Sequence, residues 1–268
     1  MRKSILGHFA ILLGVALLTT SCAPEDPRQQ TLDSLPVSMV DSLHLDVQID
    51  TFIDTTYYTG IDSAALIFDT MFYDSEIDST TLIFTVDNYT LGMPTAHDGS
   101  MHLANSAKGQ HIHLIIENNP YEAHYSNEIQ VKGDLSSKVF LAFLSRSYHL
   151  SLKHEAARYL HIPSSRSDIN PTDPMIFASR PKGAYKGIDA ESVLLDFYLV
   201  NANMPKSGYE VVVKVDGKEV DRLSEWRPYV MKGFSADGEY DLGLEIQGKN
   251  GEELGGMYST ASQNFSIQ

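Results

Sequence analysis

The chain has 268 residues, of which 20 are lysine or arginine and 35 are aspartate or glutamate, so its formal net charge is −15. This acidic balance disfavours nucleic acid as a partner, because phosphates require a basic surface, and it disfavours electrostatic adsorption to anionic lipid. Cys22 is the only cysteine, so no intramolecular disulfide can form and burial of apolar surface must stabilise the fold.

The N-terminus has the pattern of an export signal. Two basic residues, Arg2 and Lys3, precede the apolar run ILGHFAILLGVALL, and small polar residues then lead to Cys22. The run is shorter than the ~20 apolar residues that cross a bilayer, which is typical of a secretory signal. A cysteine at this position resembles the lipidation site of bacterial lipoproteins. We expect residues 1–21 to be a signal peptide and Cys22 to carry the lipid anchor. Loss of Arg2 and Lys3 would then lower the net charge from −15 to −17.

The next segment, residues 22–43, is predicted to be the lipid anchor and a flexible tether, because it has early prolines and no apolar period. Glu25 and Asp26 follow the cysteine closely. Acidic residues there resemble the surface-export signal of lipoproteins in the Bacteroidota. We therefore expect a lipid-anchored protein of the bacterial outer membrane, on the cell surface in preference to the periplasmic face. The alternative is a tether that is acidic only because tethers are polar.

Beyond residue 44 the dominant pattern is alternation of apolar and polar residues with period 2, which predicts half-buried β-strands. Turn residues separate the runs, and Asp216-Gly217 between two of them is a strong hairpin signal. The runs with this pattern are HLDVQID (44–50), TLIFTVDNY (81–89), HIHLIIEN (111–118), KVFLAFL (138–144), VLLDFYLVN (193–201), YEVVVKVDG (209–217) and YDLGLEIQG (240–248).

The runs also repeat in order, with Phe84 corresponding to Phe197 and Asn88 to Asn201. This internal repeat predicts an all-β fold of two tandem immunoglobulin-like β-sandwich domains, each near the usual size of ~100 residues. The expected boundaries are 44–164 for domain 1, 165–174 for a linker that would act as a hinge, and 175–268 for domain 2. One short helix is expected over 151–160, because Leu152, Ala156, Tyr159 and Leu160 have helical spacing.

Histidines are concentrated in domain 1. His111 and His113 are two residues apart in a predicted strand, so both side chains should point to the same face. Paired imidazoles at this spacing can supply two ligands to zinc or copper, with His102, His124 or His149 as a third. The alternative is a solvated strand face on which both histidines are merely polar positions. No other cofactor is expected.

The run FLSRSYH (143–149) contains a second candidate site. A serine and arginine followed closely by histidine resemble the forkhead-associated phosphopeptide-binding domain, although the spacing here is one residue longer and the upstream Gly-Arg pair is absent. Arg146, His149 and Lys153 are therefore predicted to face an anionic ligand. The alternative is a strand end that passes into a helix cap.

In the second half, Trp226 suits either a ligand-stacking surface or, as we expect, a core position between sheets. Arg180 and Arg227 are expected to pair with carboxylates. The chain carries none of the common enzyme motifs, such as a G-x-S-x-G elbow, H-E-x-x-H, a P-loop or a dinucleotide fingerprint.

Several segments are similar to those of a poorly characterised group of bacterial envelope lipoproteins, some of which are named phosphopeptide-binding proteins. They are GQHIHLIIENNPY, FLSRSYH, SRPKGAY, LLDFYLVNA and EWRPY. We therefore predict a non-enzymatic recognition module for a protein, phosphopeptide or glycan, attached to the membrane through its lipid. The alternative is a metal-binding protein that uses the His111/His113 strand.

Overall fold

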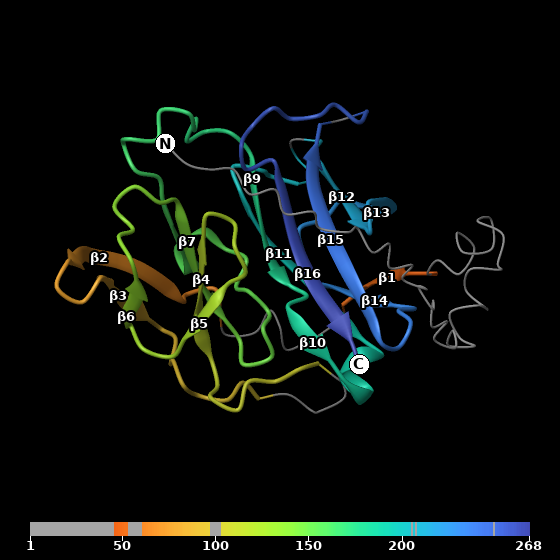
Figure 1. Ribbon diagram of the computed structural model, residues 1–268, viewed down its shortest axis with the longest axis horizontal. Coiled ribbons are helices and arrows are strands. Elements are labelled where there is room, and N and C mark those ends of the chain that lie inside the picture. Colours follow the sequence, from red (N-terminus) through yellow and green to blue (C-terminus); the bar gives the residue numbers. More distant parts are fainter. Residues whose placement is uncertain (1–45, 53–60, 97–102, 205, 207, 249) are drawn as a thin grey trace, which may run out of the picture. The chain divides into compact units, whose positions relative to one another are not determined.

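Regular structure in this protein is almost entirely β-strand (Figure 1). The structure is a computed structural model that describes residues 46–52, 61–96, 103–204, 206, 208–248 and 250–268. Within these ranges the only helical segments are two 3-10 turns, η2 (Glu155–Ala157) and η3 (Gly187–Ala190). The described part of the chain has no helix with the length and apolar character needed to span a membrane. Cys22 and the predicted signal and tether lie outside the described residues.

The first sandwich has a three-stranded and a four-stranded sheet. The first sheet has the order β2-β3-β6, with β2 (Ala65–Asp74), β3 (Ser79–Asp87) and β6 (Glu128–Lys132). The second has the order β5-β4-β7-β8, with β4 (His111–Ile116), β5 (Glu122–His124), β7 (Phe140–Ser145) and β8 (Arg158–His161). Leu82 and Phe84, two apart on β3, are fully buried between the sheets, as the period of a strand requires.

The second sandwich is built in the same way. One sheet has the order β1-β14-β11-β9, with β1 (Gln48–Thr51), β9 (Met175–Arg180), β11 (Val193–Val200) and β14 (Tyr229–Lys232). The other has the order β10-β16-β15-β12-β13, with β10 (Gly183–Tyr185), β12 (Glu210–Val215), β13 (Lys218–Leu223), β15 (Gly238–Gln247) and β16 (Thr260–Ile267). Here β10 pairs in parallel with β16, whereas the other ladders are antiparallel.

The two sandwiches share one chain path, which confirms the predicted internal repeat. β3, β4 and β7 of the first correspond to β11, β12 and β15 of the second, and each path changes sheet at the same steps. Phe84 and Phe197 are both fully buried. Asn88 and Asn201 each follow their strand with a positive φ, 54° and 57°. This strand order is that of an immunoglobulin-like β-sandwich, as predicted.

A third hydrophobic core joins the two sandwiches. β7 directs Phe140, Ala142 and Leu144 into the first sandwich, while Leu141 and Phe143 pack against residues of β9 and β11. Apolar residues therefore occupy both faces of this strand, which explains why KVFLAFL is a nearly continuous apolar run. Residues 45–268 form one compact unit.

Three expectations about local structure differ from the structure. The segment 151–160 is not a helix: only η2 is helical, and Arg158–His161 pairs with β7 as β8. Pairing with the open edge of β7 outweighs the helical spacing, because propensity is weaker than tertiary contacts. The strand expected to begin domain 1 instead pairs with β14 of the second sandwich. Ile169, in the expected linker, is buried in the shared core.

Candidate functional site: a buried histidine cluster

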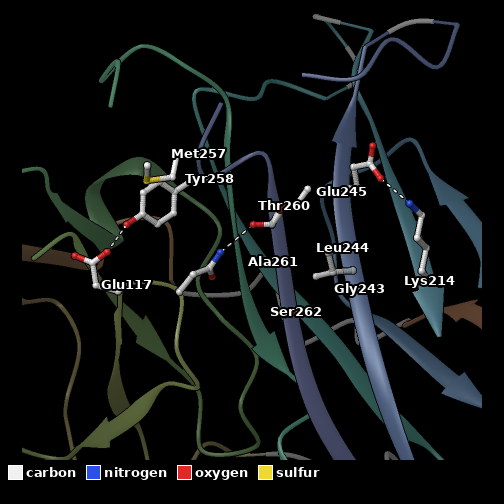
Figure 2. A pocket seen from close by; sticks show the side chains of 11 residues that line it. Glu117, Lys214, Gly243, Leu244, Glu245, Met257, Tyr258, Thr260, Ala261 and Ser262 are labelled. Carbon is white, nitrogen blue, oxygen red and sulfur yellow. Dashed lines mark hydrogen bonds and ion pairs between the residues drawn. The ribbon is translucent and has the colours of Figure 1, made fainter. Parts of the chain in front are cut away.

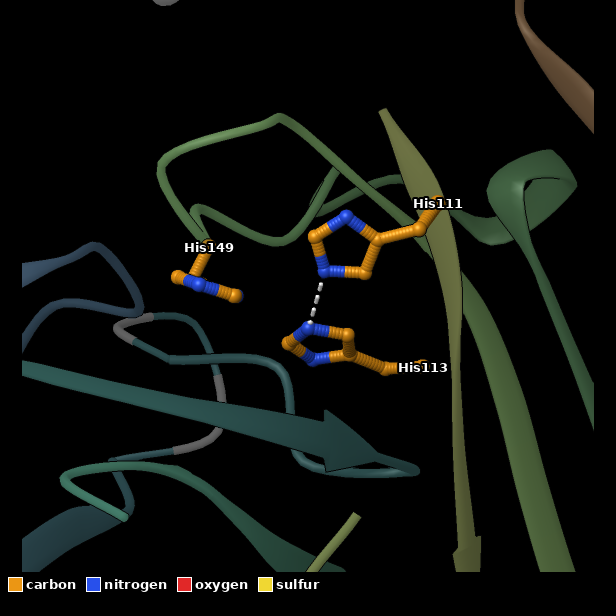
Figure 3. Close-up of side chains that lie close together, drawn as sticks. All are labelled: His111, His113 and His149. Carbon is orange, nitrogen blue, oxygen red and sulfur yellow. Dashed lines mark hydrogen bonds between the residues drawn. The ribbon is translucent and has the colours of Figure 1, made fainter. Parts of the chain in front are cut away.

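Two histidines of β4 lie next to each other on one face of the strand, as the period of a strand predicts (Figure 3). Both His111 and His113 are 0% exposed, so the solvated strand face considered as the alternative is wrong. Their ring centroids are 4.7 Å apart, and the two Nε2 atoms are 2.8 Å apart in a hydrogen bond. β4 therefore presents two imidazoles to the interior of the protein.

His149 is the third member of the cluster. It lies in the turn after β7, where its backbone N–H donates to the carbonyl of Arg146 and its φ is 69°. Its ring centroid is 5.0 Å from that of His111 and 5.7 Å from that of His113. One nitrogen from each ring can be chosen so that all three lie within 4.8 Å of one another. Of the three candidate third ligands, the structure brings His149 to the pair, while His124 Nε2 lies 3.3 Å from Glu122 Oε2 and His102 lies outside the described residues.

Each imidazole has a partner for its Nδ1 atom. The distances are 2.8 Å from His111 to the Gly109 carbonyl, 3.1 Å from His113 to the Ser179 hydroxyl, and 3.3 Å from His149 to the Tyr121 hydroxyl. A carbonyl only accepts, so His111 must donate from Nδ1, and its Nε2 then accepts from His113. A directed chain of hydrogen bonds therefore runs from His113 through His111 to the Gly109 carbonyl, while His149 is bonded to the Tyr121 hydroxyl.

Gly109 holds the carbonyl that orients His111. Its φ is +87°, and an added Cβ would lie 2.6 Å from the carbonyl carbon and oxygen of Gly92. Only glycine fits this position without a shift of backbone. The orientation of His111 therefore depends on a close backbone contact between two glycines.

Burial keeps these imidazoles unprotonated near neutral pH. It lowers the pKa of His111 to about 4 and that of His149 to about 2, and it holds the pKa of His113 well below its ordinary value. The positive charge of Arg180 adds to the effect at all three rings. Neutral imidazole is the form that binds a metal ion.

The donor set suits zinc or copper(I), for which imidazole is a common ligand. Two imidazole nitrogens on a tetrahedral zinc ion are about 3.4 Å apart, given bonds of about 2.0–2.1 Å. The Nε2 atoms of His111 and His113 would therefore separate by roughly half an ångström. His113 would then carry its proton on Nδ1 and donate to the Ser179 hydroxyl. Both rings would keep their Nδ1 partners, which then act as the outer contacts that orient metal ligands.

The predicted anion-facing residues lie in different environments. Lys153 is buried, and its ammonium group donates to Asp196 Oδ1 at 2.8 Å, to the Phe197 carbonyl at 2.7 Å and to Ser151 at 3.0 Å. Arg146 lines a groove together with Tyr89. His149 belongs to the histidine cluster. The structure thus brings His149 to His111 and His113 and not to a group with Lys153.

A separate groove lies beside β15 and β16 (Figure 2). Its charged residues already satisfy one another: Glu117 accepts from Arg166 and from the Tyr258 hydroxyl, both at 3.0 Å, and Lys214 donates to Glu245 at 2.7 Å. Side chains paired in this way offer little charge to a ligand.

Three residues of the second sandwich have other roles predicted from the sequence. Trp226 is partly buried against the cores, as expected, and donates to the Phe197 carbonyl at 3.0 Å. Arg227 pairs with Glu225 at 3.1 Å, as expected. Arg180 does not follow this expectation, since it has no carboxylate partner among the described residues. It donates instead to the Tyr185 hydroxyl at 3.2 Å, a contact that its motif SRPKG does not predict.

Comparison with known proteins shows no family for this chain. No family model matches the chain, and no curated protein matches it. Among solved structures, the central fibronectin-III array of RIM-binding protein is 12% identical, covering 78% of this chain and 70% of its own, with a TM-score of 0.27. The fibronectin(III)-like modules of CbhA from Clostridium thermocellum are 10% identical, covering 74% and 94%, with a TM-score of 0.27. The strand order described above, and not these scores, identifies the chain as a tandem of immunoglobulin-like β-sandwiches.

Proposed function

We propose that this protein is a lipid-anchored, non-enzymatic binding protein of the bacterial envelope, and that its ligand is a zinc or copper(I) ion held by His111, His113 and His149. The observation that carries the proposal is the convergence of three neutral, buried imidazoles, each with a partner for its Nδ1 atom. Burying polar rings is costly unless they are hydrogen-bonded or bind a metal. A metal ion would use the remaining nitrogens of all three.

The surrounding charges favour a particular form of the bound ion. Arg180 and Lys182 lie close enough to lower the pKa of His113 and His149, and no acidic residue belongs to the cluster in the described part of the chain. A bare divalent ion is disfavoured there by like-charge repulsion. Copper(I), with its single charge, or zinc with an anionic fourth ligand, suits the site better. Three protein ligands leave that fourth position open.

The wider recognition role, toward a protein, a phosphopeptide or a glycan, stays a prediction. The anion-facing group predicted for it consists of Arg146, His149 and Lys153. The ammonium group of Lys153 is instead paired with Asp196.

The proposed location is supported by the sequence of the N-terminus, with Cys22 as the acceptor of the acyl chains. Each buried CH2 of such a chain contributes about 0.8 kcal/mol to membrane binding. Metabolic labelling with a radioactive fatty acid tests this, since label should enter the wild-type protein and be absent from Cys22→Ser. Cleavage of the protein by a protease added to intact cells would support the outer face of the outer membrane, and protection would place it on the periplasmic face.

Metal binding is tested by calorimetric titration of residues 23–268, a soluble form that contains the whole compact unit. We expect one zinc or copper(I) ion per chain with micromolar or tighter affinity. The double variant His111→Ala/His113→Ala should lose this binding. The matched control is His124→Ala. It removes a histidine of the neighbouring strand β5 that lies beside Glu122 and outside the cluster, and it should leave binding unchanged. Equal affinity in wild type and double variant would refute the proposal.

A further inference from the structure

Strand β2 has an open edge in the described part of the chain. It pairs with β3 alone, at one side of the sheet β2-β3-β6 (Figure 1). After a register shift between Phe68 and Thr70, residues 70–74 pair regularly with β3. An edge of this kind presents backbone N–H and C=O groups to which another strand can bond, and proteins commonly protect it with lysine or proline. β2 contains neither of these residues.

Exposed apolar side chains are concentrated on β2 and on the turn that follows it, residues 65–78, which we call the β2 segment. Four of the seven large apolar side chains that are exposed in the described chain belong to it. They are Ile67 (47% exposed), Phe72 (53%), Tyr73 (41%) and Ile77 (64%). Apolar side chains gathered in one place typically mark a surface that binds a partner, whereas single exposed ones need no explanation.

A bulge in β2 places two of these side chains on one face. Residues an odd number of positions apart on a regular strand point to opposite faces, but the extra residue at Asp69 shifts the later part of the strand by one position. Ile67 and Phe72 therefore both lie on the outer face of the sheet, opposite threonines of β3. This outer face provides an apolar surface next to the open edge.

The charge of the β2 segment indicates the kind of partner that it fits. It holds four acidic residues and no lysine or arginine, a formal charge of −4, and these acids are Asp69, Asp74, Glu76 and Asp78. The hydrogen bonds that its aspartates accept come from neutral groups, namely the Thr85 hydroxyl, the Glu76 backbone N–H and the Tyr73 hydroxyl. A second copy of the chain would bring like charges together here. The tether over 22–43, with four acids and one arginine, would do the same.

We propose that the β2 segment binds an extended segment of another protein, in which basic residues flank alternating apolar ones. The partner would add to the sheet as a strand beside residues 70–74, which is the mode of recognition called β-augmentation. Its apolar side chains would contact Ile67 and Phe72, because side chains on one face of neighbouring strands pack together. Its basic ends would lie near Asp69 at one end of the open edge and Asp74 at the other. The inference rests on the predicted recognition role and not on the metal site.

The test is fluorescence anisotropy of the labelled peptide Lys-Lys-Ile-Thr-Ile-Thr-Lys-Lys, titrated with residues 23–268 in the presence of a chelator. We expect saturable binding that weakens as salt is added. Ile67→Ser/Phe72→Ser should weaken it about tenfold or more, because the apolar contact is lost while every charge stays. The matched control is Met257→Ser, at an exposed methionine of the second sandwich, which should leave binding unchanged.

A second pair of variants tests the charge. Asp74→Asn/Glu76→Gln should weaken binding about fivefold at low salt and less at high salt. Glu252→Gln/Glu253→Gln removes the same charge at exposed positions of the second sandwich and should have no effect. Equal weakening by the two double variants would show that the peptide responds only to the net charge of the protein, and would overturn the inference.

A second peptide tests the added strand. It has the same side chains and carries methyl groups on its two central amide nitrogens, so neither of its edges can complete a ladder, and it should bind about tenfold or more weakly. Equal binding of the two peptides would overturn the inference. So would failure of the first peptide to bind, or its equal binding to an Ile67→Ser/Phe72→Ser variant that keeps the wild-type unfolding temperature.

Analytical ultracentrifugation tests the alternative occupant. We expect the same oligomeric state for wild type and for Ile67→Ser/Phe72→Ser, whereas a dimer that dissociates in this variant would overturn the inference in favour of a second copy of the chain. Because the chelator removes metal ions from the peptide titration, its failure is distinct from failure of the zinc and copper titration.

Discussion

The three buried imidazoles make the stability of the metal-free protein depend on pH above the range in which carboxylates titrate. An ordinary histidine has a pKa of about 6.5 in the unfolded chain, whereas burial lowers the pKa of His111 to about 4 and that of His149 to about 2 in the folded protein. Between these values the unfolded state binds more protons than the folded state. The free energy of unfolding therefore decreases as the pH falls below about 6.5.

The size of the effect follows from the shifts. At pH 5 an unfolded imidazole is almost fully protonated and the folded ones are not, so each of His111 and His149 removes about 2 kcal/mol of stability relative to pH 8. His113, whose pKa is also lowered, acts in the same direction. The sum, about 4 kcal/mol or more, is a large part of the 5–15 kcal/mol that is typical of a folded domain.

Urea-induced unfolding of metal-free protein at several pH values from 8 to 5 measures this dependence. His149→Gln should remove about 2 kcal/mol of it, because glutamine does not titrate. Carboxylates with lowered pKa, such as Glu117 and Glu245, lose their contribution only at lower pH, so they do not account for a change in this window. A free energy of unfolding that is constant or that increases from pH 8 to pH 5 would refute the reasoning.

Three further predictions concern single contacts. Lys153→Met should destabilise the protein by about 3–5 kcal/mol in chemical denaturation, because it leaves the fully buried Asp196 unpaired. The double variant Lys153→Met/Asp196→Leu should recover most of this loss. A single variant as stable as wild type would contradict the ion pair. Gly109→Ala should cost about 1–3 kcal/mol by the same assay, because of its φ of +87° and the close contact with Gly92; no loss would contradict that contact. Ser179→Ala should weaken zinc or copper(I) binding about tenfold in calorimetry by removing the partner of His113, and unchanged affinity would show that the hydroxyl does not orient the ring.

The sequence was sufficient to predict the architecture, because the relevant signals are local and periodic. Alternation along YDLGLEIQG places Tyr240 and Leu242 in the core, and Asp216-Gly217 forms the predicted hairpin between β12 and β13. The prediction of a helix over 151–160 was wrong because its residues also suit a strand. Pairing with the open edge of β7 favours the strand. No local signal reports such an edge.

Half of the candidate site could be predicted for the same reason. Period 2 alone places His111 and His113 on one face, whereas the approach of His149 depends on how the turn after β7 folds back. Arg180 was expected to pair with a carboxylate. Instead it donates to the Tyr185 hydroxyl, while Asp196, opposite it in the β9–β11 ladder, pairs through Oδ1 with Lys153 of the other sandwich. Contacts between residues so far apart in the chain leave no pattern in a single sequence from which they could be predicted.

The most direct test of the central claim is X-ray absorption at the metal edge, measured on protein loaded with one equivalent of zinc or copper(I). We expect a first shell that contains the nitrogens of three imidazoles, and no such shell in His111→Ala/His113→Ala, which should not bind the metal. A shell made of oxygen atoms, or a wild-type spectrum identical to that of the double variant, would show that the histidine cluster does not hold the metal.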